Sequence, residues 1–338
     1  MPCGVTEEKV INKIIRFVTG CGLAITAAFT AAPVIAADAY PVRPIRFIVP
    51  FPPGGANDIV ARLLGPKLTE RLGVSIVVDN RPGAAGTIAL ELTARAQPDG
   101  YTFLVGNATS NGIVPIVYAD RMKVNVTKEL KGVTLLAAIP HVVIASAKFP
   151  PNTFQEMVDY VKARPGELNY NAPLGGHPHL DMLALTAAAG LKMVHLPSKG
   201  AGETIPSLMR GEAQISNSNV ASVIGLIRAG TLKAYAVTSA QRVPEMPNVP
   251  SLTELGFKGI GSINWVGLIA PAATPRTIIN RLHAASVAIL TDPETKEQLA
   301  KRLVPVAVSA SPAEFDAFLA SELKRWAKLV KDHNVKLD

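Results

Sequence analysis

The sequence carries the stretch IRFIVPFPPGGAND at residues 45–58, and this stretch decides the class of fold. A largely apolar run of strand type is followed by a loop rich in proline and glycine. Apolar residues then recur at helical spacing over residues 59–72, and Gly73 ends that run. We therefore predict a strand, a turn and a helix that is capped by Asn57 or Asp58.

A second stretch of the same kind, LNYNAPLGGHPHL, lies at residues 168–180. It predicts a strand over 168–171, a glycine loop and a helix over 178–189. Strands and helices alternate along the rest of the chain, which is typical of a parallel α/β sheet. Further strands are expected at 75–79, 102–106, 192–196, 212–216, 233–238 and 265–270, and helices at 87–96, 153–163, 201–209, 220–229, 275–290, 293–302 and 312–331.

Each of these two loops contains a pair of adjacent glycines, Gly54-Gly55 and Gly175-Gly176. Paired glycines permit positive φ angles, so successive backbone N–H groups can point into one concavity. The helix that follows adds its positive end. Two such loops in separate halves of the chain predict a cleft that grips one anion from both walls.

The first 39 residues have the layout of a secretory signal. Basic residues within positions 9–16 precede an uncharged run at 17–37, and small residues near Ala37 or Ala39 suit a cleavage site. A retained membrane anchor is the alternative, because the run is just long enough to span a bilayer. We expect export to a bacterial periplasm with cleavage near Ala37 or Ala39.

Composition agrees with an exported globular protein. Both cysteines, Cys3 and Cys21, fall in the signal segment, so the mature chain holds its fold without disulfides. The 338 residues are 48% hydrophobic and 18% charged, which suffices for two α/β domains. The net charge of +8 is spread along the chain without an aromatic-basic stripe, so we expect no nucleic-acid partner.

Further motifs accompany the opening stretch. They are YP at 40–41, PIRFIVPFPPGG at 44–55, NRPGA at 80–84, PDGYT at 98–102, HLP at 195–197, AVTS at 236–239 and, within 265–271, Trp265, Gly267-Leu268 and Ala270-Pro271. In these motifs the sequence from Tyr40 onward resembles the Bug family of extracytoplasmic solute receptors, the binding subunits of tripartite tricarboxylate transporters. The resemblance implies a periplasmic binding protein of the Venus-flytrap type, with two α/β lobes and a two-segment hinge. Lobe 1 would comprise residues 40–140 plus 266–338, and lobe 2 residues 141–265.

The resemblance also implies the ligand, the partners and the site. The ligand would be a small organic carboxylate, either a di- or tricarboxylate or an aromatic carboxylate, held by backbone amides of the two glycine loops. The partners would be the permease subunits, and we expect a monomer without a cofactor. The implied ligand-binding residues are Phe51, Gly54, Gly55, Ala56, Asn57, Asp58, Thr109, Ser110, Leu174, Gly175, Gly176, His177 and Asn217.

Two departures from the family pattern concern the second loop and the far end of the ligand. The loop around Gly175 is one residue shorter than usual, so its residues transfer loosely. The usual acidic residue near Asn217 is missing, which favours a dicarboxylate over an amino acid as the ligand.

Three side chains close together in the sequence could form a metal site or contact the ligand: His177, His179 and Asp181. A metal site is not expected, because the remaining histidines lie in unrelated segments and no cysteine is available as a further ligand. We expect His177 to donate to the bound anion and His179 to pack and cap. Asp58 is expected to cap its helix or to bond loop amides, since a carboxylate beside an anion would repel it.

No catalytic pattern is present, since the chain lacks a Gly-x-Ser-x-Gly elbow and Walker A spacing. We therefore expect no enzyme. The alternatives left open are an exported α/β enzyme acting on a carboxylate, centred on His177, His179 and Asp181, and a ligand sensor for a two-component kinase.

Overall fold

The computed structural model describes residues 40–258, 260 and 263–332, so the predicted signal segment lies outside the described residues. From Pro41 onward these residues belong to one compact unit. Within this part of the chain, no helix combines the length and the apolar character needed to cross a bilayer.

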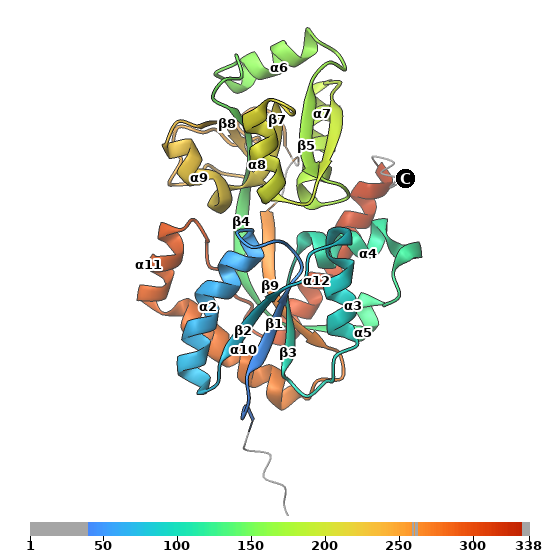
Figure 1. The fold of residues 1–338 in the computed structure, drawn as a ribbon, viewed down its shortest axis with the longest axis vertical. Coiled ribbons are helices and arrows are strands. Elements are labelled where there is room, and N and C mark those ends of the chain that lie inside the picture. The colour runs from blue at the N-terminus through green and yellow to red at the C-terminus, as the bar shows by residue number, and fades with distance from the viewer. Residues whose placement is uncertain (1–39, 259, 261–262, 333–338) are drawn as a thin grey trace, which may run out of the picture. The chain divides into compact units, whose positions relative to one another are not determined.

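The first sheet has the strand order β2-β1-β3-β9-β4 (Figure 1). Strand β1 (Ile45–Val49) is parallel to both β2 (Ile76–Asn80) and β3 (Thr102–Asn107). Strand β9 (Ile263–Pro271) is antiparallel to β3 and to β4 (Leu130–Ser146). In this sheet the prediction of parallel strands is therefore correct for β1, β2 and β3, and two long antiparallel strands complete a mixed sheet.

The second sheet is built on the later part of β4. Strands β7 (Ile215–Asn219) and β8 (Leu232–Val237) pair with β4 in antiparallel fashion. Strand β5 (Asn169–Pro173) lies between β7 and β6 (Val194–Ser198) and is parallel to both. This sheet is also mixed.

Strand β4 belongs to both sheets and was not predicted. Pro140 is its last residue that pairs with β9, opposite Ile263, and His141 pairs with Asn219 of β7. The chain therefore passes from one sheet to the other between Pro140 and His141. Figure 1 shows β4 and β9 side by side where the two α/β groups meet.

Helices pack against both sheets, and the predicted helices are confirmed with bounds that differ by a few residues. The C-terminal helices return to the first sheet, where α10 and α12 contact β4. The helices of the first group are α2 (Ala56–Leu72), α3 (Thr87–Ala94), α10 (Arg276–Thr291), α11 (Pro293–Lys301) and α12 (Pro312–Asp332), with short turns η1 (Ala84–Gly86), η2 (Ala108–Ile113), α4 (Val114–Val117), η3 (Ala119–Arg121) and α5 (Val126–Glu129); those of the second are α6 (Phe154–Lys162), α7 (His177–Ala189), α8 (Ala201–Arg210) and α9 (Val220–Arg228).

Each sheet has its own apolar core. Ile48, Leu104 and Phe315 are fully buried on the first sheet. Val143 and Ile215 are buried on the second, together with side chains from α6 and α7. Burial of apolar surface is the main favourable term in folding, so each α/β group has its own source of stability.

Candidate ligand-binding site

A cleft lies where the carboxyl ends of strands from both sheets meet. Its empty space is about 700 Å³, including the part open to solvent. The loop after β1 and the start of α2 form one wall, and residues of β7 and the start of α7 form the other. This is the place where open α/β sheets bind ligands.

The cleft brings together residues that are far apart in the sequence. The predicted ligand-binding residues that line it are Phe51, Gly55, Ala56, Asn57, Thr109, His177 and Asn217. The other predicted residues do not line the cleft: Gly54, Asp58, Ser110, Leu174, Gly175 and Gly176. Of these, Leu174 lines a neighbouring pocket together with Lys199.

The two glycine loops have nearly the same backbone conformation. The first glycine of each pair is left-handed, with φ of 85° at Gly54 and 65° at Gly175. The second is extended and is the N-cap of the next helix, with φ and ψ of −76° and 167° at Gly55 and −87° and 168° at Gly176. The expected positive φ is therefore confirmed in both loops.

The second loop uses its amides within the protein, which corrects the prediction that both loops present amides to the ligand. The N–H of Gly175 donates to Nδ1 of His179 at 3.1 Å, and that of Gly176 donates to the carbonyl of Pro173 at 2.9 Å. The N–H of His177 donates to Oγ1 of Thr109 at 3.0 Å. Pro178 has no N–H to offer. His179 therefore bonds a loop amide without capping α7, and its ring stacks on that of His195, so only the predicted packing role is confirmed.

The first loop leaves the start of α2 open to the cleft. Gly54 donates to Oδ2 of Asp58 at 3.0 Å, so that amide is engaged. The helix begins at Ala56 without a side-chain cap. Ala56 and Asn57 line the cleft, and N–H groups in the first turn of a helix have no intrahelical acceptor.

Asn57 and Asp58 do not cap α2, contrary to prediction, because the helix starts before them. The side chain of Asn57 donates to the carbonyl of Val105 at 2.7 Å and accepts from Nδ2 of Asn107 at 2.8 Å. These bonds hold the start of α2 against β3 beneath the cleft.

Asp58 bonds a loop amide, as predicted, and also anchors two side chains. Its Oδ1 accepts from Arg62 at 2.9 Å and from Asn80 at 3.0 Å. Burial favours the neutral acid, but the hydrogen bonds from Arg62, Gly54 and Asn80 outweigh it and lower the pKa of Asp58. The residue supports the loop from behind.

Sequence reasoning missed His141 and Asn264, which come from β4 and β9 and line the cleft. His141 is 1% exposed, and neither of its ring nitrogens has a hydrogen-bond partner. The Oδ1 atoms of Asn217 and Asn264 are also buried without a partner. Buried polar atoms normally have a hydrogen-bond partner, so these partnerless atoms in the cleft walls can form hydrogen bonds with a solute. A polar residue inside the apolar run of β4 was the signal for His141.

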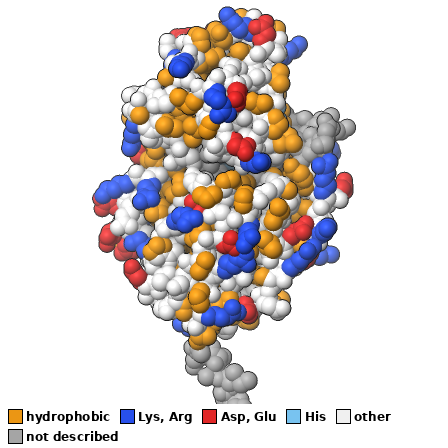
Figure 2. Space-filling model, in the orientation of Figure 1, with side chains coloured by type: hydrophobic (Ala, Val, Ile, Leu, Met, Phe, Trp, Pro, Cys, Tyr) orange, Lys and Arg blue, Asp and Glu red, His pale blue; other side chains and the backbone are white. Residues whose placement is uncertain are grey.

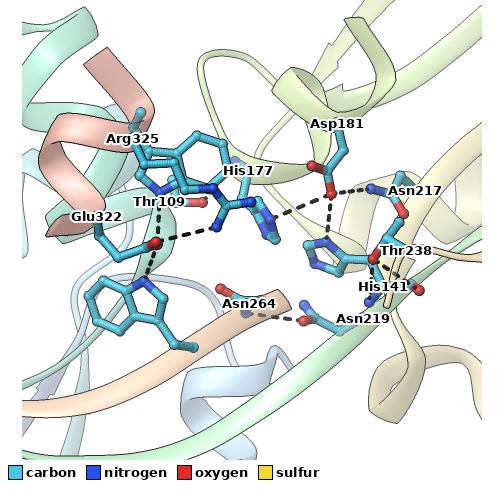
Figure 3. A network of polar contacts seen from close by, with 12 residues as sticks. Thr109, His141, His177, Asp181, Asn217, Asn219, Thr238, Asn264, Glu322 and Arg325 are labelled. Atoms are coloured by element: carbon cyan, nitrogen blue, oxygen red, sulfur yellow. Dashed lines mark hydrogen bonds and ion pairs between the residues drawn. The ribbon is translucent and has the colours of Figure 1, made fainter. Parts of the chain in front are cut away.

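A buried polar cluster joins the two histidines of the cleft to Asp181 (Figure 3). Oδ2 of Asp181 lies 3.5 Å from Nδ1 of His141 and 3.5 Å from Nε2 of His177, and it accepts from Nδ2 of Asn217 at 3.0 Å. Burial lowers the pKa of His177 to about 3, so its imidazole is neutral at neutral pH. An acidic group thus does lie beside Asn217, although its sequence position could not show it.

Helix α12 supports His177 from the side of the first sheet (Figure 3). The ring of Trp326 meets that of His177 edge-on, with centroids 5.2 Å apart. Oε2 of Glu322 accepts from the indole N–H groups of Trp326 at 3.0 Å and Trp265 at 2.8 Å. His177 therefore has a fixed position between the two α/β groups.

The charged surface shows no concentrated field on the face drawn in Figure 2. Lys and Arg side chains are interspersed there with Asp and Glu. The chain carries a net charge of +8, which favours the approach of anions in general.

Two α/β groups, a strand that passes between them and a cleft at the strand ends define a solute-binding protein of the periplasmic type. Residues 60–335 match the family described as tripartite tricarboxylate transporter family receptor, TctC. The chain belongs to this family of periplasmic receptors, whose members are solute-binding proteins. The resemblance to Bug receptors is confirmed.

Individual relatives agree with this assignment. Protein BugT of Bordetella pertussis is 34% identical over 95% of this chain and 98% of its own length. The structure of R. palustris Rpa4515 with adipate has a TM-score of 0.84 at 28% identity and covers 88% of this chain and 99% of that one. MatC of Rhodopseudomonas palustris with bound malate has a TM-score of 0.80 at 29% identity and covers 86% of this chain and 100% of that one.

Proposed function

We propose that the cleft captures a small organic dicarboxylate, closes around it and presents it to the permease subunits of a tripartite transporter. The observation that carries the proposal is the single cleft shared by the open start of α2 and the buried polar groups of His141, Asn217 and Asn264. Adipate in Rpa4515 and malate in MatC, both dicarboxylates, support the class of ligand.

One carboxylate of the ligand binds at the start of α2. Ala56 and Asn57 line the cleft, and their N–H groups belong to the first turn of a long helix, at its positive end. Hydrogen bonds from N–H groups to a charged oxygen are stronger than neutral ones, and the surrounding proline and phenylalanine side chains exclude water.

The opposite wall recognises the rest of the ligand through side chains, because its loop amides are engaged. His141 and His177 donate an imidazole N–H to the second carboxylate, whereas the buried oxygens of Asn217 and Asn264 are acceptors that suit a hydroxyl or a protonated carboxyl group. Asp181 lies beside Asn217, so the absence of the family's usual acidic residue near Asn217 in the sequence does not favour a dicarboxylate. The preference for a dicarboxylate now rests on the relatives' ligands.

Closure takes place between lobe 1, residues 40–140 plus 266–338, and lobe 2, residues 141–265. The passage of β4 from one sheet to the other at Pro140 supports the first of these boundaries. Hinge closure is the common response of two-lobed binding proteins, because the second lobe completes the contacts to the ligand. The receptor acts as a monomer, is cleaved near Ala37 or Ala39, and performs no catalysis.

A thermal-shift panel tests the function. Adipate, malate, citrate and benzoate are added to the purified chain, with glucose as the neutral control. We expect a saturable rise in unfolding temperature with one or more dicarboxylates and none with glucose. Unchanged melting with every acid contradicts the proposal. Release of the bound acid in altered form, detected by NMR after denaturation, would support the enzyme alternative instead.

A further inference from the structure

The buried cluster in the cleft wall contains the donor set of a metal site. One ligand atom each from His141, His177 and Asp181 lies within 4.8 Å of the other two, and all three side chains are buried. They come from two elements, β4 and the start of α7. His141 and His177 also line the cleft.

We propose that His141, His177 and Asp181 bind a divalent cation of intermediate softness, with Zn²⁺ as the best fit. Two imidazoles and one carboxylate are the ligands of many zinc sites that keep an open position. The proposal goes beyond the function above and does not depend on it, because the cation binds without an organic acid.

Two of the three separations suit such an ion, and the ligand atoms of the two imidazoles lie within 4.8 Å of each other. With zinc bonds of about 2.0–2.2 Å, tetrahedral ligand atoms lie about 3.3–3.6 Å apart. Asp181 Oδ2 is 3.5 Å from Nδ1 of His141 and 3.5 Å from Nε2 of His177. These separations are long for direct hydrogen bonds and short for unrelated groups.

Two further observations support a ligand at this point. Both ring nitrogens of His141, a residue that is 1% exposed, lack hydrogen-bond partners. Asn217 donates to the same Asp181 oxygen at 3.0 Å and so orients the carboxylate, as groups around metal ligands do. Because the histidines line the cleft, the remaining coordination position is open to a carboxylate oxygen of a solute.

The test is a titration of the chelator-treated full chain with Co²⁺, followed by visible absorption, and with Zn²⁺, followed by calorimetry. We expect one equivalent to bind, with the strong visible bands of low-coordinate Co²⁺. His141→Ala and Asp181→Asn should each weaken Zn²⁺ binding by more than about 100-fold, since loss of an outer partner alone costs 10–100-fold.

His283→Ala is the matched control, because His283 bonds the carbonyl of Ser309 on another face of the fold. It should leave the titration unchanged. Far-UV circular dichroism checks the fold of each variant, and Asp181→Asn keeps the size of the side chain. Absence of Co²⁺ bands in the wild-type chain overturns the proposal, as does Zn²⁺ binding that is unchanged in both folded cluster variants.

Discussion

The backbone N–H of His177 donates to Oγ1 of Thr109 at 3.0 Å, although the two residues belong to different α/β groups. Thr109 follows β3, and His177 begins α7 after β5. The bond therefore crosses the cleft between the two α/β groups. Together with the contact of Trp326 on the His177 ring, it joins the groups directly.

Thr109→Val tests this link, because valine has nearly the same shape and no hydroxyl. The buried N–H of His177 loses its acceptor, and we expect the free energy of unfolding to fall by about 1–3 kcal/mol. Urea denaturation measures the change. Thr109→Ser keeps the hydroxyl and should retain most of the stability, so equal losses in the two variants would contradict the role of the bond.

Ala56→Pro tests the amide at the start of α2. Proline removes one N–H and is tolerated at the first helical position, and the extended Gly55 before it suits a following proline. We expect dicarboxylate affinity to fall about 10–100-fold, which corresponds to the loss of one hydrogen bond to a charged group. Calorimetry with the acid identified in the thermal panel measures it.

Ala56→Val is the control for that variant, since it adds bulk in the cleft and keeps the N–H. Its affinity should exceed that of Ala56→Pro. If the valine and proline variants bind equally weakly, bulk rather than the amide explains the loss.

Asp58→Asn tests the support of the first glycine loop and carries a pH dependence. The folded-state pKa of Asp58 is lowered, so its carboxylate contributes stability above the unfolded value of about 3.9 and loses it as pH falls through the folded value. At pH 7 we expect the free energy of unfolding of the variant to be lower by about 1–3 kcal/mol, because the charge-assisted hydrogen bond to Arg62 is lost.

The measurement is urea denaturation of both proteins at several pH values. The difference in the free energy of unfolding between wild type and Asp58→Asn should be constant from neutral pH to about 5 and should shrink below about 4. Asp120→Asn on the exposed surface is the control and should show little change at neutral pH. A gap that widens in acid would contradict the lowered pKa.

The glycine loops could be predicted from sequence because strand, turn and helix signals are local. Glycine permits the left-handed angles found at Gly54 and Gly175, so a tight turn could be expected at each pair. Strand β4 could not be predicted, because it is apolar on both faces, shows no alternation and contains Pro140. Because strand β4 was not predicted, its antiparallel pairing in both sheets was not predicted either.

The candidate site was only partly predictable for the same reason. The first loop depends on its own residues, and Ala56 and Asn57 do reach the cleft. The amides of the second loop are engaged by Thr109 and by the ring of His179, which depends on tertiary placement and one side-chain orientation. His141 joins His177 only because β4 passes from one sheet to the other.

A last prediction concerns the packing of β9 against α12, beside the cleft. A Cβ atom added at Gly267 would overlap the ring of Phe315, which is fully buried and has no space to yield. Gly267→Ala should therefore lower the free energy of unfolding by about 1–3 kcal/mol. Gly225 in α9 has nothing within 4 Å of an added Cβ, and alanine favours a helix over glycine by about 1 kcal/mol. Gly225→Ala should thus stabilise the chain in the same urea titration, and a stabilising effect at Gly267 would show that α12 does not press on β9 as the structure describes.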